Sequence, residues 1–421
     1  MADLVPAPAP TSDAATLVLG EFESREVALP PQAVALLRGR YATQIEAATT
    51  DRPGIYRLAT RGYVGRVRLP GAGLLVIRPK VGVTNLFYML AGDPALAHFT
   101  QPPADLAPDP EIFSFVLAML VHRVERLLSG GLLQGYVPQE EDLPFVRGRI
   151  VLAAQLRRHG DLKNRHVCSY AAFTPDTPEN RVVAATLRFL PALLQPAEDR
   201  ALARRGRALL GRFVDVPAIS REEALALLPR IYFHRLNAAY APVLSLCRLA
   251  LHHLTLAEQA GQHPFASFLV DMPRLFESFV TARLRAGLAA HGLRVVAQHY
   301  DYLDEARQVG IRPDVLVYPA GGAEPVLVVD AKYRRIGPDA TGDLSRDLYQ
   351  VSAYLDRYGL RRGVLVYPQF EEATGTELKL RGTPKQLHLY TLNLAAPTLP
   401  ELERQSAILA EQVARLAQGE R

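Results

Sequence analysis

The feature that most constrains the fold of this chain is a β-hairpin pattern with charged residues at its open end. Two apolar runs, VLVY and VLVV, flank the turn-like segment PAGGAEP. When Tyr318 pairs with Val326, the antiparallel register places Asp314 opposite Asp330, and directly opposed residues share a face with Cβ atoms about 4.5–5.5 Å apart. Lys332 lies two residues beyond Asp330 and therefore points to the same face. The sequence thus predicts two carboxylates and one ammonium group on one small patch.

These charges follow a strand that reads as buried. A carboxylate in such a place is unfavourable unless it is paired, hydrogen-bonded or bound to a metal. Mg²⁺ uses one or two carboxylates and completes its shell with water and phosphate oxygens, so Asp314 and Asp330 are predicted metal ligands. Lys332 would orient a water or stabilise charge on a phosphate. The alternative is a cross-strand ion-pair cluster, in which Arg312 and Lys332 neutralise the two aspartates.

The segments on either side of the hairpin extend this pattern. A helix is predicted from the N-cap Asp271 to Gly292, and Glu277 borders its apolar stripe, where it would face the charged patch or solvent. A short strand over 295–300 follows. After the hairpin, a helix over 343–358 carries Gln350 and Tyr354 one turn apart, as a pair that reaches a phosphate or as an ordinary polar face. A further strand begins at Gly363.

The order helix, three strands, helix, strand resembles the PD-(D/E)XK nuclease superfamily. The matching residues are Glu277, Asp314, Asp330-Ala-Lys332 and Gln350-x-x-x-Tyr354. Upstream segments, among them GYVGRVRL from Gly62, LVIRPKVG from Leu75 and FVRGRI from Phe145, are similar to the amino-terminal part of the McrC family. McrC proteins are the nuclease subunits of McrBC-type, modification-dependent restriction systems. The resemblance covers most of residues 55–395.

The resemblance implies a Mg²⁺-dependent endonuclease that cleaves double-stranded DNA. Asp314, Asp330 and Lys332 would be catalytic and Glu277 an accessory acid, while Gln350, Tyr354 and Arg312 would support them. A separate, McrB-like hexameric AAA+ GTPase would translocate the DNA and supply recognition of modified cytosine. The amino-terminal part would dock on that hexamer and stimulate GTP hydrolysis. Candidate contact residues are Arg57, Arg61, Arg66 and Arg68, which alternatively are strand arginines on a solvated or DNA-facing surface.

We expect a multidomain α+β or α/β protein. The predicted parts are a flexible tail (1–16), a mostly β partner-docking domain (17–100), a helical middle domain (101–265), a nuclease domain with an αβββαβ core (266–400) and a C-terminal helix (401–421). The middle helices are expected at 110–130, 178–194, 197–213 and 230–258.

Composition narrows the function classes. The net charge of +5 is compatible with a nucleic-acid partner. The two cysteines are far apart, so neither a disulfide framework nor a zinc site is indicated. No Gly-Lys-[Ser/Thr] is present, and we expect nucleotide hydrolysis to come from another protein. No signal peptide or membrane span is indicated, so a cytoplasmic location is expected. Two other functions remain open: a stand-alone repair or defence nuclease, and a catalytically silent assembly subunit that activates a GTPase.

Overall fold

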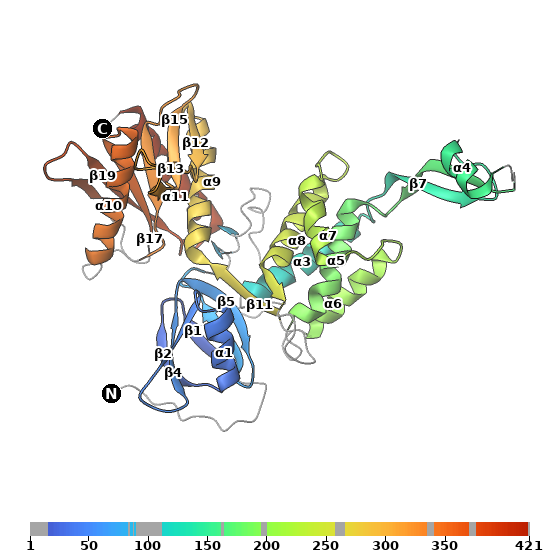
Figure 1. Ribbon diagram of the computed structural model, residues 1–421, viewed down its shortest axis with the longest axis horizontal. Coiled ribbons are helices and arrows are strands. Elements are labelled where there is room, and N and C mark those ends of the chain that lie inside the picture. Colours follow the sequence, from blue (N-terminus) through green and yellow to red (C-terminus); the bar gives the residue numbers. More distant parts are fainter. Residues whose placement is uncertain are drawn as a thin grey trace. The chain divides into compact units, whose positions relative to one another are not determined.

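The computed structural model describes residues 16–82, 85–86, 88–89, 112–160, 164–194, 200–256, 266–334, 341–369 and 376–419. The chain divides into two compact units (Figure 1). The first combines Met1–Pro102, Ala107–Phe113 and Ser267–Arg421, and the second combines Pro103–Leu106 with Ser114–Ala266. Both ends of the chain therefore belong to one unit, and most of the second unit is a single insertion between them.

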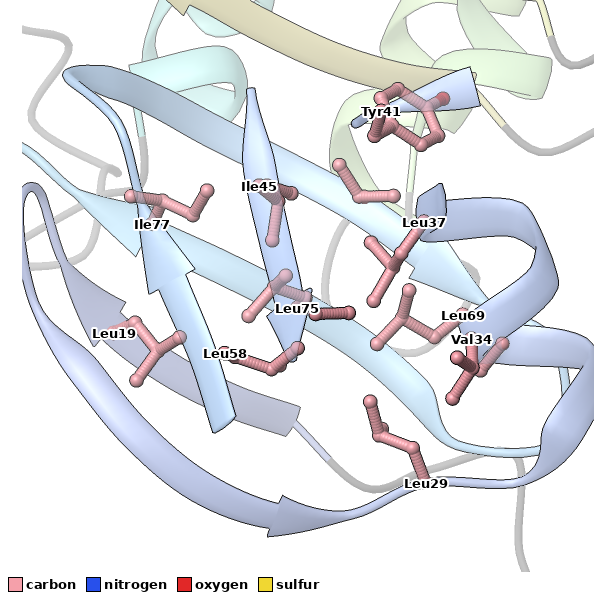
Figure 2. Packing of buried hydrophobic residues seen from close by; sticks show 13 residues of the cluster. Leu19, Leu29, Val34, Leu37, Tyr41, Ile45, Leu58, Leu69, Leu75 and Ile77 are labelled. Atoms are coloured by element: carbon pink, nitrogen blue, oxygen red, sulfur yellow. The ribbon is translucent and has the colours of Figure 1, made fainter. Parts of the chain in front are cut away.

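The amino-terminal part of the first unit is built mainly from strands, as expected. They are β1 (Thr16–Gly20), β2 (Ser24–Ala28), β3 (Ile45–Thr49), β4 (Ile55–Thr60), β5 (Tyr63–Leu69) and β6 (Gly73–Arg78). Strands β1, β6 and β5 form one sheet together with β11 (Ala266–Asp271), and β2, β4 and β3 form another. Figure 2 shows the apolar side chains that pack between these strands and one helix, including Leu19, Leu58 and Leu75.

That helix, α1 (Pro31–Arg40), was not predicted. Its first residue is a proline, which is favoured at the start of a helix. Ala33, Val34 and Leu37 form its buried face. The spacing of these three residues is helical, so the signal was present in the sequence but is short.

The second unit contains more than helices. Its helices are α3 (Ile112–Leu128), α4 (Leu152–His159), α5 (Pro178–Leu193), α6 (Arg200–Leu210), α7 (Arg221–Leu227) and α8 (Ala241–His253), and β10 (Leu254–Leu256) follows α8. Helices α3, α5 and α6 lie where helices were expected, whereas α8 covers only part of the 230–258 prediction. The strands β7 (Gly135–Leu143), β8 (Arg149–Ile150) and β9 (His166–Thr174) form an antiparallel sheet that was not predicted. Strand β7 reads GYVPQEEDL, whose polar residues and proline hide the alternation of a typical strand.

The carboxy-terminal part of the first unit is a mixed six-stranded sheet with helices against it. The strand order is β12 (Leu293–Ala297), β15 (Val315–Pro319), β16 (Leu327–Ala331), β17 (Arg362–Gln369), β19 (Gln386–Asn393) and β18 (Thr376–Lys379). The small strands β13 (Asp301–Tyr302) and β14 (Gly310–Ile311) pair separately. The helices are α9 (Met272–Ala289), α10 (Thr341–Tyr358) and α11 (Leu399–Gln418). The strand predicted over 295–300 is correct in kind but begins two residues earlier and ends at Ala297.

Helix α10 covers one face of this sheet. Leu316, Val328 and Leu365 share a buried apolar cluster with Val351 and Leu355 of α10. Because side chains alternate along a strand, residues 314 and 330 point to the same face as 316 and 328. The fold therefore brings the open end of the hairpin next to α10.

Across the described ranges, no helix combines the length and the apolar character needed to cross a lipid bilayer.

Candidate functional site

The hairpin register places the two aspartates as the sequence predicted. Val315 pairs with Val329 and Leu316 with Val328, and extending this antiparallel register by one position places Asp314 opposite Asp330 at the open end. The backbone N–H of Ala331 donates a hydrogen bond to Asp314 Oδ2 at 2.8 Å. The first aspartate is thus held against the strand that carries the second.

Lys332 joins the hairpin to α10. Its Nζ lies 2.6 Å from Asp330 Oδ2 and donates a hydrogen bond of 2.9 Å to Gln350 Oε1. Gln350 in turn donates through Nε2 to the hydroxyl of Tyr354 at 2.7 Å. The predicted pair on α10 is therefore the next link after the lysine. Burial raises the pKa of Tyr354 to about 12, so its hydroxyl stays protonated at neutral pH.

Glu277 also faces the site, from helix α9. Asp271 caps this helix by accepting a hydrogen bond from Arg274 N at 3.0 Å, as expected from the sequence. The Glu277 carboxylate accepts a hydrogen bond from Gln298 Nε2, which also donates to Asp314 Oδ1 at 3.0 Å. Gln298 thus bridges the two acids.

Gln298 was missed by sequence reasoning. It lies just past β12 with a left-handed backbone (φ 53°), which is uncommon for a residue other than glycine. Its backbone N–H donates to the carbonyl of Asp314 at 2.9 Å, so the backbone contact fixes its position. Nothing in the local sequence distinguishes it from other glutamines.

A second buried polar group lies next to the site; the sequence placed it on the same helix face as Gln350 and Tyr354 but assigned it no role. Asp347 of α10 is 1% exposed and pairs with Arg334 Nη2 at 2.5 Å. It also accepts a hydrogen bond from the hydroxyl of Tyr367 at 2.8 Å. Its charge acts on Asp330 in the direction that raises the pKa of that carboxyl. Asp347 thus adds a further buried carboxylate to the group, in which Arg334 pairs with Asp347 and Lys332 pairs with Asp330.

The electrostatics of the cluster favour an added cation. Asp330 is 1% exposed and Asp314 9%. Burial, followed by the charges of Asp330 and Glu277, raises the pKa of Asp314 to about 8. Burial also raises the pKa values of Asp330 and Glu277, with Lys332 opposing the shift at Asp330. The three carboxyl groups resist ionising together, and a bound divalent cation would stabilise their ionised forms.

The ligands available here suit Mg²⁺, which keeps several waters, better than a metal ion coordinated by protein side chains alone. Among the residues that the structure describes, no three His, Cys, Asp or Glu side chains form a ready-made metal cage. Asp330 Oδ2 is buried without a hydrogen-bond partner of normal geometry among the described residues, and it lies 2.6 Å from the Lys332 ammonium. Asp314 and Asp330 could supply two carboxylate ligands and would leave the other positions to water and phosphate, as is usual for Mg²⁺.

The arginines for which the sequence predicted a role differ in their exposure to solvent. Arg312 is exposed, and its charge partly offsets the burial that raises the pKa of Glu277. Arg57 and Arg61 are exposed and pair with Glu26 and Glu46. Arg66 is 3% exposed and Arg68 is half-buried.

Fold and site together describe an α/β protein with a buried acidic cluster and a lysine at the end of a mixed sheet. The family model for the "McrBC 5-methylcytosine restriction system component" matches residues 58–368, and the chain belongs to that family. It is therefore a component of a McrBC-type restriction system.

Two relatives illustrate the match. The chain is 25% identical over 344 residues to the type IV methyl-directed restriction enzyme EcoKMcrBC of Escherichia coli (strain K12), covering 75% of this chain and 94% of the relative. It also resembles a chain in the half-complex of Thermococcus gammatolerans McrB AAA+ hexamers with bound McrC, with a TM-score of 0.62 and 17% identity. That match covers 95% of this chain and 100% of the other, and it supports the fold.

Proposed function

We propose that this protein is the Mg²⁺-dependent DNA endonuclease subunit of its restriction system, with a PD-(D/E)XK core. Asp314 and Asp330 would hold the metal. Lys332 would act on the scissile phosphate or on the attacking water, and Glu277 would be the accessory acid. The observation that carries this proposal is the convergence of both aspartates and Lys332 at one end of the hairpin, with the pKa of Asp314 raised to about 8.

The side chains around the metal ligands have separable tasks. When bound, the metal would polarise the phosphate and lower the pKa of a water. Lys332 is held between Asp330 and Gln350, so its ammonium can stabilise negative charge that develops on the phosphate. Gln298 keeps Asp314 and Glu277 in fixed orientations. These contacts organise the site before substrate binds.

The proposal includes a partner, because the structurally similar chain comes from a complex of McrB AAA+ hexamers with bound McrC. Besides the four amino-terminal arginines, a second surface suits a protein partner. We call residues 135–174, which include β7, β8, α4 and β9, the arm. In Figure 1, β7 and α4 extend away from the helices of their own unit.

The tip of the arm exposes several large apolar side chains. Phe145, Val146, Leu152 and Leu156 are all more than half exposed, and Arg147, Arg149, Arg157 and Arg158 lie among them. Contiguous exposed apolar residues with a polar rim are typical of protein-binding surfaces. We propose that this tip contributes to docking on the AAA+ hexamer, and that docking stimulates GTP hydrolysis.

An Asp330→Ala variant tests the proposal. It should abolish Mg²⁺-dependent cleavage of modified DNA in the presence of the GTPase and GTP, and it should abolish Mg²⁺ binding by calorimetry. Folding and complex assembly should be unchanged. Asp356→Ala is a matched control, because Asp356 is an exposed aspartate of α10 that pairs with Lys385 at the surface.

Retained cleavage by folded Asp330→Ala protein would contradict the mechanism. Cleavage by the purified chain with Mg²⁺ alone would instead favour a stand-alone nuclease. GTPase stimulation without any metal binding would favour a catalytically silent assembly subunit.

A further inference from the structure

A buried hydrogen bond connects the amino-terminal strands to the residue directly after Lys332. The hydroxyl of Tyr333 donates to the carboxylate of Glu21, with distances of 3.0 and 3.2 Å to the two oxygens. Glu21 is only 2% exposed, and its Oε1 also accepts from the backbone N–H of Lys80 at 2.6 Å. A carboxylate buried this deeply is retained only where its hydrogen bonds hold it. The metal and phosphate chemistry proposed above does not use it.

The ring of Tyr333 is enclosed by aromatic side chains from both parts of the first unit. It packs against Phe276 of α9 with ring centroids 5.8 Å apart, and against Phe22 at 6.3 Å. Phe22 has a left-handed backbone (φ 60°), which is unfavourable for a bulky residue. The turn after β1 therefore keeps a strained conformation that places Glu21 and Phe22 against Tyr333.

Arg334 also restrains the backbone near Lys332, because its N–H donates to the carbonyl of Lys332 at 3.1 Å and its side chain pairs with Asp347. Strand β16 ends at Ala331. Just past its end, Lys332 N donates a hydrogen bond of 2.8 Å to the carbonyl of Val366 in the neighbouring strand β17. Tyr333 is the next residue, and its side chain is anchored at both ring and hydroxyl. Fixing the residue on each side of Lys332 restricts the directions in which the lysine side chain can leave the backbone.

We propose that Glu21 and Tyr333 are positioning residues for Lys332, so that the amino-terminal strands complete the nuclease site. The effect on turnover rests on the function proposed above, whereas the effect on the placement of Lys332 does not. Removing the Tyr333 hydroxyl would loosen the end of β16 and let the ammonium move away from Asp330 and Gln350. Small displacements of a catalytic group reduce the rate of the chemical step far more than they reduce binding.

A second tyrosine–carboxylate contact in the same unit is the matched control. The hydroxyl of Tyr63 donates to Asp271 Oδ2 at 2.9 Å, so it too connects an amino-terminal strand to the carboxy-terminal part. It reaches the start of α9 and not the end of β16. General loosening of the unit would follow from either substitution, whereas displacement of Lys332 should follow only from changes at Glu21 or Tyr333.

The test compares Tyr333→Phe, Glu21→Gln, the double variant and Tyr63→Phe in the full chain. The sequence has only five lysines, namely Lys80, Lys163, Lys332, Lys379 and Lys385. After ¹³C-dimethylation, the Lys332 signal can be assigned by its loss in Lys332→Arg, and its chemical shift reports the ammonium's surroundings without any substrate. Thermal unfolding, Mg²⁺ binding and steady-state cleavage with the GTPase partner complete the set.

We expect the Lys332 signal to move in both single variants and in the double variant, with no larger shift in the double. We expect kcat to fall at least tenfold, with KM for DNA and Mg²⁺ affinity within about twofold of the wild type. Tyr63→Phe should leave the signal and kcat unchanged. An unmoved Lys332 signal in Tyr333→Phe would overturn the inference whatever the activity. If the Lys332 signal moves in these variants but the wild-type protein itself never cleaves DNA, the positioning contact is upheld and the proposed function is rejected.

Discussion

Replacing Asp314 with asparagine should stabilise the metal-free protein at neutral and alkaline pH. Folding raises the pKa of this carboxyl from 3.8 to about 8, because the group is buried beside Asp330 and Glu277. The folded protein therefore holds a proton that the unfolded chain releases. Stability from this group is fully present below pH 3.8 and is lost as the pH rises toward 8.

The magnitude follows from the size of the shift. Each pH unit above the unfolded pKa lowers the free energy of unfolding by about 1.4 kcal/mol, so the loss at pH 7 is on the order of 4 kcal/mol. Asparagine does not titrate, and its carbonyl can still accept from Ala331 N. We expect Asp314→Asn to raise the free energy of unfolding by roughly 2–4 kcal/mol at pH 8 and by much less at pH 4.

Urea unfolding between pH 4 and pH 8.5, with and without Mg²⁺, measures this effect. Mg²⁺ at about 100 times its dissociation constant should stabilise the wild type by about 2.7 kcal/mol and leave the variant unaffected. A variant that is less stable than the wild type at pH 8 without metal, or equally stabilised by Mg²⁺, would refute the reasoning.

Three further outcomes are expected. Gly363→Ala should lower the free energy of unfolding by about 1–3 kcal/mol, because its Cβ would lie 2.8 Å from Val351 Cγ1; chemical denaturation measures this, and an unchanged midpoint would contradict the packing. Leu156→Asp should weaken association with the AAA+ partner at least tenfold without changing Tm or Mg²⁺ binding, as checked by light scattering, and unchanged affinity would remove the arm tip from the interface. Gln350→Ala should reduce kcat about tenfold or more while KM stays constant, because Lys332 loses its contact on α10; an effect confined to KM would instead indicate a role in DNA binding.

Much of the site was predictable because its geometry follows from one hairpin. The turn segment fixed the register of Asp314 and Asp330, and the alternation of a strand then placed Lys332 on their face. Helical spacing related Gln350 to Tyr354 in the same way. Each of these relations depends on residues that are close in sequence, where local rules apply.

The parts that were missed depend on contacts between distant segments. The side chain of Gln298 donates to Glu277, and Gln298 itself has a left-handed backbone conformation that no sequence rule predicts. Glu21 is separated from Tyr333 by 312 positions, and its neighbours in sequence give no reason to expect a buried carboxylate. The arm sheet was missed for a different reason, since no residue of β7 is fully buried and its polar residues and proline hide any apolar alternation.

The separation of Glu21 from Tyr333 has a consequence for biosynthesis. The amino-terminal strands leave the ribosome early, but the tyrosine that closes on them is made 312 positions later. The whole insertion is translated in between. A nascent chain therefore cannot form the Glu21–Tyr333 hydrogen bond until residue 333 has been made, and a fragment that starts after the insertion lacks the carboxylate to which Tyr333 donates.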